Sequence, residues 1–179
     1  MESQSLCTMQ DFYGATIHAR LAVAQRLHAE LGAEMAANGA FSRMLAQAEV
    51  LEKELALTMA GLELGALCTA CAVKAGGGCC SSFMAGENDA IQLLLNLMAG
   101  VPVAIVREDG ECCFLAERGC LLRFKPMFCL NYNCRQIRDG AGIDRLQGLE
   151  QAAGRLLQQQ YGLEQLLLEF LWQRGRLTG

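Results

Sequence analysis

Two stripes of regularly spaced residues, separated by an Asn-Gly break, dominate the first third of the chain. Both recur at steps of three and four, which places their members on one face of a helix. The first comprises Ile17, Leu21, Ala24, His28, Leu31 and Met35, and the second Phe41, Met44, Leu45, Ala48, Leu51, Leu55, Met59 and Leu62. Asn38-Gly39 between them is typical of a helix end. Because the link is short, we expect residues 10–65 to form an antiparallel helical hairpin.

A third apolar stripe fills the end of the chain, from residue 141 to 174. It forms a broad face made of Ile143, Leu146, Leu149, Ala153, Leu156, Leu157, Leu163, Leu166, Leu167, Phe170 and Leu171. Gly154 and Gly162 fall inside this stretch, and glycine costs a helix about 1 kcal/mol relative to alanine, so the pattern leaves open whether the helix is continuous. Three long helices predict a mainly α-helical bundle, with residues 1–179 forming a single domain.

The region between the second and last helices, residues 66–135, has a different pattern. A short helix is expected over residues 88–97, because Asn88 or Asp89 can cap its start and Gly100 and Pro102 follow its end. Residues 101–106 are β-like and lead to turn sequences at positions 109–110 and 118–119. We therefore predict two or three very short strands, arranged as hairpins, in a region inserted into the helical bundle.

Composition and charge narrow the class of protein. The chain is 53% hydrophobic, so it can build a core without the disulfides that small secreted domains need. Its net charge is −4 and no basic run occurs, which argues against nucleic acid as a partner. The first residues lack the pattern of a secretory signal, and no apolar stretch reaches about 18 residues, so we expect neither export nor membrane insertion. The sequence thus predicts a cytoplasmic protein, whose thiols glutathione would keep reduced.

Nine of the ten cysteines lie between Cys68 and Cys134. Reduced, clustered thiols are soft donors, and Cys-x-x-Cys can bring two sulfurs to one point through a tight turn. Such a cluster favours a thiolate-ligated metal centre. Because the thiols outnumber the ligands of one zinc and no histidine lies nearby, an iron–sulfur cluster of the [4Fe–4S] type is favoured over zinc. The candidate ligands are Cys68, Cys71, Cys79, Cys80, Cys112, Cys120, Cys129 and Cys134.

The order of these residues resembles the YkgJ-like family of zinc- or iron-chelating proteins. The resemblance covers residues 68–134 and rests on Cys68-x-x-Cys71, Cys79-Cys80, Cys112-x-Phe114-Leu115, Cys120, Lys125-Pro126, Cys129 and Cys134. The spacing is longer than usual before Cys79 and one residue short before Cys129, and a lysine replaces the family's arginine. The resemblance implies metal or cluster binding. A related cysteine module accompanies methyl transfer in flagellin lysine methylases, which implies that an accessory role in such a reaction is conceivable.

The sequence is compatible with several functions. The metal centre could serve electron transfer, redox sensing or metal handling, or it could be a structural zinc that supports an interaction module. An enzyme of methyl transfer or thiol redox chemistry is the third hypothesis. Cys113 is expected to pack or to support the site, and Cys7 to be incidental in a loose terminus, while Lys125 either neutralises thiolate charge or is simply exposed. A homodimer or another protein partner is compatible with the apolar faces, although a bundle core explains them equally well.

Overall fold

Helices make up most of the protein, as the apolar stripes predict. The computed structural model describes residues 6–72, 79–108, 110–117, 119–131 and 133–178. Its three long helices are α1 (Ile17–Ala37), α2 (Gly39–Gly61) and α8 (Ile143–Gln173). Asn38 ends α1 and also caps α2, because its side-chain oxygen accepts hydrogen bonds from the backbone amides of Ala40 and Phe41 at 3.0 and 3.1 Å. The mainly α-helical class is therefore confirmed.

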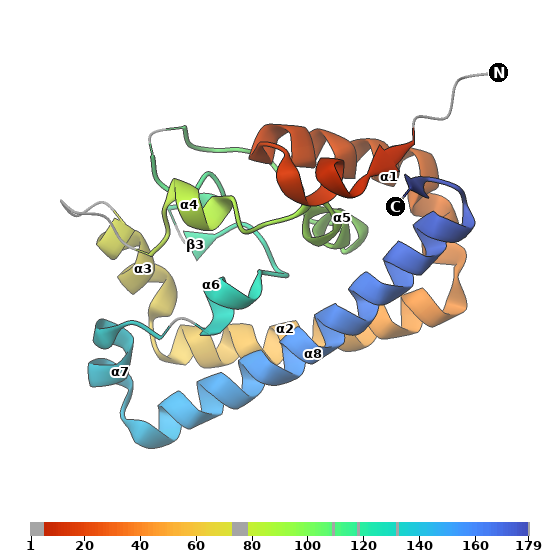
Figure 1. Cartoon of the computed structure of the whole chain (residues 1–179). Coiled ribbons are helices and arrows are strands. Elements are labelled where there is room, and N and C mark those ends of the chain that lie inside the picture. The colour runs from red at the N-terminus through yellow and green to blue at the C-terminus, as the bar shows by residue number, and fades with distance from the viewer. Residues whose placement is uncertain (1–5, 73–78, 109, 118, 132, 179) are drawn as a thin grey trace.

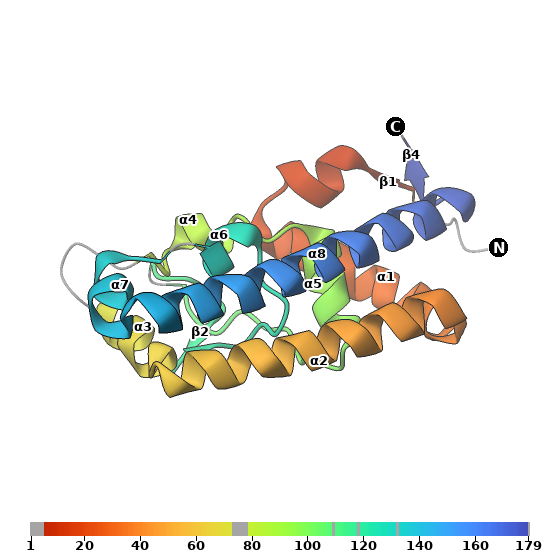
Figure 2. The ribbon, with the colours of Figure 1, turned by 90° about the horizontal axis from the view of Figure 1, so that it is seen from below.

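The helices pair differently from the expected hairpin. α2 and α8 run antiparallel, side by side, along one side of the molecule (Figures 1 and 2), and α1 packs mainly on the short helix α5 (Ala90–Met98). α1 and α2 touch each other far less. The reason lies in α5, which is apolar on most of its surface and mostly buried, so it needs cover from several neighbours.

α8 is continuous although it contains three glycines. At Gly162 the missing side chain has a use, because a Cβ there would lie 2.6 Å from the terminal methyl carbon of Met44 on α2. The glycine therefore lets the two long helices approach closely. At Gly154 a Cβ would meet no atom of the described residues within 4 Å.

Both ends of the described chain are tied down together. β1 (Cys7–Thr8) pairs in parallel with β4 (Leu177–Thr178), and the amide of Cys7 donates to the carbonyl of Arg176 at 2.9 Å. Cys7 is fully buried, and Nη2 of Arg26 lies 2.9 Å from its sulfur. The expectation of an incidental cysteine in a loose terminus is therefore wrong: Cys7 belongs to the core. A π-helical turn, η1 (Gln10–Gly14), connects β1 to α1.

The middle of the chain is built from short elements. They are α3 (Leu64–Ala72), α4 (Ser82–Ala85), β2 (Leu115–Ala116), β3 (Gly119–Cys120), α6 (Met127–Asn131) and α7 (Arg135–Ala141). α5 begins at the predicted cap, where the Asp89 carboxylate accepts from the amide of Gln92 at 2.7 Å. The buried apolar side chains of these elements and of the long helices form one core.

The predicted strand at residues 101–106 is not present. The segment is extended, but the amide of Val106 donating to the carbonyl of Cys113 at 2.9 Å is a single bond rather than a ladder. Pro102 contributes no amide hydrogen to a ladder. The second predicted hairpin does form, as β2 and β3, although Asp109 and Arg118 of the two turn sequences lie outside the described residues. No helix in the described part of the chain is both long and apolar enough to cross a bilayer.

Candidate metal centre

Backbone pairing places Cys79-Cys80 beside Cys112-Cys113. The segment that precedes α4 runs antiparallel to residues 110–112, with Ser81 and Glu111 forming a β-bridge. The amide of Cys112 donates to the carbonyl of Cys80 at 3.2 Å, and the amide of Ser82 donates to the carbonyl of Gly110 at 3.0 Å. Residues 32 positions apart in the sequence, Cys80 and Cys112, are thus held next to each other by main-chain hydrogen bonds.

The β2–β3 hairpin adds Cys120 to this pair. Leu115 stands opposite Cys120 in the antiparallel register, and the amide of Leu115 bonds to the carbonyl of Cys112 at 2.9 Å. Gly119 has a φ of 114°, a conformation that side chains other than hydrogen rarely allow, and it turns the chain into β3. The tight turn therefore returns Cys120 towards Cys112.

Two helices supply further thiols. Cys68 lies on α3, which contacts β3, and Cys129 lies on α6, which packs on α8. The expectation that Cys68-x-x-Cys71 forms a tight turn is wrong, because both residues lie within α3. Residues three apart on a helix share a face only approximately, and here Cys68 lines a cavity that Cys71 does not reach.

This cavity has a volume of about 370 Å³ and collects most of the predicted ligands. Six of the eight line it: Cys68, Cys79, Cys80, Cys112, Cys120 and Cys129. The other walls are largely apolar and come from α2, α3, the hairpin, α6, α7 and α8. Cys71 and Cys134 do not line the cavity, although their charges partly oppose the hydrogen bond with Cys80 that lowers the pKa of Cys68. The structure therefore brings six of the eight predicted thiols to one space and leaves two beside it.

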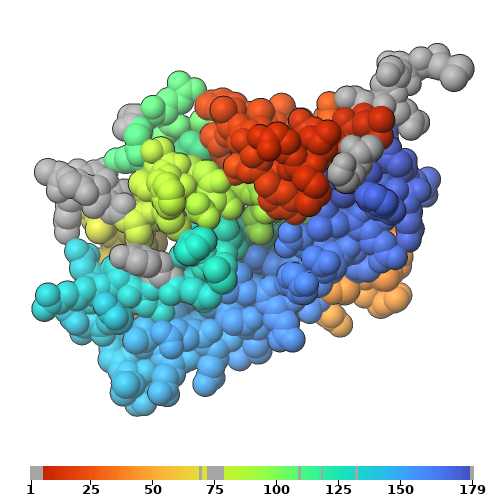
Figure 3. Space-filling model, viewed as in Figure 1, coloured from red at the N-terminus to blue at the C-terminus, as the bar shows by residue number. Residues whose placement is uncertain are grey.

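The cavity reaches the surface at α6. Phe128 lines it and is 51% exposed, and Cys120 and Cys129 also have access to solvent. α4 and α6 adjoin on the face seen in Figure 3, between the N-terminal segment and α8. Phe83 on α4 is 75% exposed. An ion or small solute can therefore enter from solvent without unfolding the core.

Burial and mutual repulsion act on the thiols. Burial, followed by the charges of Cys120, Cys112 and Cys80, raises the pKa of Cys129 to about 12. A hydrogen bond to Cys68 raises the pKa of Cys80 to about 12, and the same bond lowers the pKa of Cys68, the sulfur that accepts it. The pKa of each of these thiols is therefore affected by the neighbouring cysteines.

Burial is also the main cause of the raised pKa of Cys112 and of Cys120, although the ammonium of Lys125 opposes it at Cys120. Cys120 keeps some solvent access, but protein surrounds its sulfur on most sides, so desolvation still disfavours the thiolate. Such thiols stay protonated at neutral pH unless a cation replaces the proton. Apart from Cys68, whose pKa is lowered, the thiols that line the cavity are therefore neutral soft donors.

The thiols are not yet arranged as a coordination shell. The nine cysteines from Cys68 to Cys134 are all free thiols. Within the described residues, no group of three or more His, Cys, Asp or Glu side chains is placed so that it could hold a metal ion as it stands. Cys113 is buried, its pKa is raised to about 11 chiefly by burial, and it does not line the cavity, which agrees with a packing role. The donor chemistry suits a soft metal, while ligation would require the side chains to turn.

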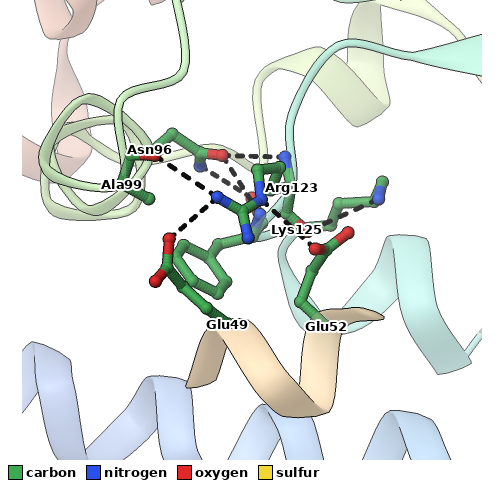
Figure 4. A network of polar contacts seen from close by, with 7 residues as sticks. Glu49, Glu52, Asn96, Ala99, Arg123 and Lys125 are labelled. Atoms are coloured by element: carbon green, nitrogen blue, oxygen red, sulfur yellow. Dashed lines mark hydrogen bonds and ion pairs between the residues drawn. The ribbon is translucent and has the colours of Figure 1, made fainter. Parts of the chain in front are cut away.

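The sequence does not predict one polar network that lies beside the cavity (Figure 4). Arg123 bonds through Nη1 to Glu49 at 2.9 Å and through Nε to Glu52 at 3.2 Å, both on α2. Asn96 of α5 is fully buried, and its Oδ1 accepts from the amides of Arg123 and Phe124 at 2.9 and 3.0 Å. Its Nδ2 donates to the carbonyl of Phe124 at 2.8 Å. Two helices thus hold the segment that leads into Lys125 and α6.

A single sequence clue could have drawn attention to this network. Arg123-Phe124-Lys125-Pro126 places two cations around an aromatic residue, directly before a proline, which is unusual for a loop between apolar segments. The two carboxylate partners of Arg123 lie more than 70 residues away, so no local pattern could identify them. No family model matches the chain, and neither a curated protein nor a solved structure shows significant similarity to it.

Proposed function

We propose that this protein binds a thiolate-ligated metal centre, an iron–sulfur cluster of the [4Fe–4S] type, in the cysteine-lined cavity, and that it serves electron transfer, redox sensing or metal handling in the cytoplasm. The observation that carries the proposal is that six thiols from five separate segments line one cavity. Thiols that merely pack would have no reason to share one space that opens to solvent.

The size and chemistry of the cavity favour a cluster. A tetrahedral zinc site has Zn–S bonds of about 2.3 Å and closes tightly around its ion. The space here is about 370 Å³, wider than four sulfurs around one ion would leave. Among the residues that the structure describes, no histidine lines the cavity, so the donor set offered to a metal is sulfur-rich. Largely apolar walls would also limit water around a bound cluster, which is one of the factors that set its potential.

Four thiols are the best candidates for direct ligation. Cys80, Cys112 and Cys129 act on one another electrostatically, and Cys120 acts on both Cys112 and Cys129. Cys80 and Cys112 are also joined through their backbones. We infer that these four provide the ligands and that Cys68, hydrogen-bonded to Cys80, stands ready as a neighbouring thiol.

The test is anaerobic purification followed by iron and acid-labile sulfide analysis and an absorption spectrum. About four iron and four sulfide per chain are expected for one [4Fe–4S] cluster. Protein that is colourless and lacks both elements under strict anaerobiosis, even after reconstitution with iron and sulfide, refutes this form of the proposal. About one zinc per chain without sulfide would instead support the zinc module, for which the same cysteines would be the ligands.

Variants identify the ligands. Cys112→Ser and Cys129→Ser should each abolish or strongly reduce cluster content, because serine is a harder donor than a thiolate. The matched control is Cys113→Ser, which removes a sulfur adjacent in sequence to Cys112 but outside the cavity lining. Equal cluster content in all three variants would contradict the assignment of ligands. Equal loss in all three would indicate a general folding defect, which a urea titration of the metal-free proteins would detect.

A further inference from the structure

Lys125 stands out because its main chain is fixed on both sides. Nε2 of Gln160 on α8 donates to the carbonyl of Lys125 at 2.9 Å, and Asn96 binds the adjoining Phe124 through its amide and its carbonyl. Pro126 follows and restricts the backbone further. Contacts with the three helices α2, α5 and α8 therefore fix the backbone position of Lys125.

The side chain of Lys125 belongs to the cavity. It is half-buried and lines the same space as the six thiols, with Nζ 3.5 Å from the carbonyl oxygen of Arg123 (Figure 4). The other cation of the lining, Arg123, is already compensated by Glu49 and Glu52. Among the ion pairs found between described residues, none includes Lys125. Its positive charge is thus left to act on whatever negative charge the cavity holds.

The thiols on either side of Lys125 in the sequence are the ones that respond to it. Lys125, Cys120 and Cys129 line the same cavity, and the positive charge of Lys125 opposes the effect of burial on the pKa of both thiols. Each thiolate ligand brings a negative charge into a largely apolar space, which costs free energy unless a cation lies nearby. One-electron reduction of a bound cluster would add one more negative charge at the same place.

We propose that Lys125 is a positioning residue that supplies the counter-charge of the metal centre, so that it promotes metal uptake by Cys120 and Cys129 and favours the reduced state of the cluster. This inference rests on the proposed function and assigns to one side chain the electrostatic control of that site. A fixed cation stabilises the more negative of two states more strongly, so its removal makes reduction harder. The same removal makes thiolate formation harder and the metal easier to lose.

The experiment compares Lys125→Gln, Lys125→Met and Lys125→Arg with the wild-type protein and with Lys53→Gln, which neutralises an exposed lysine on α2. Because the carbonyl of Lys125, not its side chain, binds Gln160, all variants should fold with the urea midpoint of the wild type. The two neutral variants should show a more negative midpoint potential in a dithionite titration. They should also lose iron to a chelator on the order of tenfold faster, as expected for one uncompensated charge in a partly buried site.

Lys125→Arg keeps the charge, so its midpoint potential and iron loss should be closer to those of the wild type than those of either neutral variant. Lys53→Gln should be indistinguishable from the wild type in both measurements. If the centre contains zinc, the same ranking is expected for zinc affinity measured by competition with a chromogenic chelator. Wild-type potential and metal retention in both neutral variants would overturn the role of Lys125 and leave the proposed function intact. A wild-type protein that takes up neither cluster nor zinc would overturn both.

Discussion

Replacing Asn96 by alanine should be among the most destabilising single substitutions in this chain. The side chain is fully buried and makes hydrogen bonds through both of its polar atoms. Truncation removes the partner of the Arg123 amide and of both the amide and the carbonyl of Phe124. The Phe124 groups are buried and that of Arg123 is partly buried, so water cannot replace all three partners.

The magnitude follows from those three groups. A buried backbone group that loses its partner costs about 1–3 kcal/mol, so three of them amount to roughly 3–9 kcal/mol if the segment stays in place. A domain of this size has a free energy of unfolding of about 5–15 kcal/mol, so the loss would be a large share of it. The segment would relieve part of the cost by moving away from α5, which would also disturb Lys125 and the start of α6.

The assay is urea unfolding of the metal-free protein under reducing conditions, with Asn96→Ala beside Gln151→Ala. Gln151 is exposed on α8, so its truncation should change stability by no more than about 0.5 kcal/mol. We expect a much lower midpoint for Asn96→Ala with a similar slope, and faster hydrogen exchange at the Phe124 amide. If Asn96→Ala lies within about 1 kcal/mol of the control, the segment does not depend on this side chain and our account of how the cavity wall is held is wrong.

Two further predictions concern α8. Gly154→Ala should stabilise the protein by about 1 kcal/mol, whereas Gly162→Ala should gain little or nothing, because its new methyl group must displace Met44; equal gains in urea midpoint would contradict this. Burial raises the pKa of Glu164 above its ordinary 4.5, and the charge of Asp89 raises it further. The contribution of this carboxyl group to the free energy of unfolding should therefore be greatest below pH 4.5 and should be lost as the pH rises through the folded-state pKa. Glu164→Gln should therefore flatten the pH dependence of stability in that range, and an unchanged curve would show that the carboxyl group is not desolvated.

The long helices could be predicted because their information is local. The Asn38 break, the Asp89 cap and the apolar stripes each act within a few residues, and all appear in the structure within a few positions of where the sequence places them. The pairing of the helices could not be predicted in the same way. α5 is apolar around most of its circumference, and an all-round apolar helix shows that it is buried but not which neighbours bury it.

In the candidate site, too, local patterns could be predicted from the sequence and long-range contacts could not. The spacing Cys68-x-x-Cys71 fits either a turn or a helix, and only the packing of α3 against β3 determines that one of the two sulfurs reaches the cavity. The strand expected at residues 101–106 does not form because a strand needs a partner strand, and among the described residues only the bond from Val106 to Cys113 joins this segment to another extended segment. The number and order of the cysteines predict a shared site for eight of them, of which six line the cavity, whereas the ion pairs of Arg123 with Glu49 and Glu52 span more than 70 residues.

The absence of a ready coordination shell among the described thiols is compatible with metal binding once backbone and side chain are considered separately. Main-chain hydrogen bonds fix the positions from which Cys80, Cys112 and Cys120 project, while rotation about their side-chain bonds costs little. The segment next to them is held by Asn96 and Arg123, which need no metal. Uptake of a metal would then turn sulfurs inward on a frame that already exists. Removal of the metal by a chelator should accordingly leave the far-ultraviolet circular dichroism almost unchanged and should speed amide exchange only in the thiol-bearing segments, whereas global loss of helix would mean that the metal, not the apolar core, holds the frame.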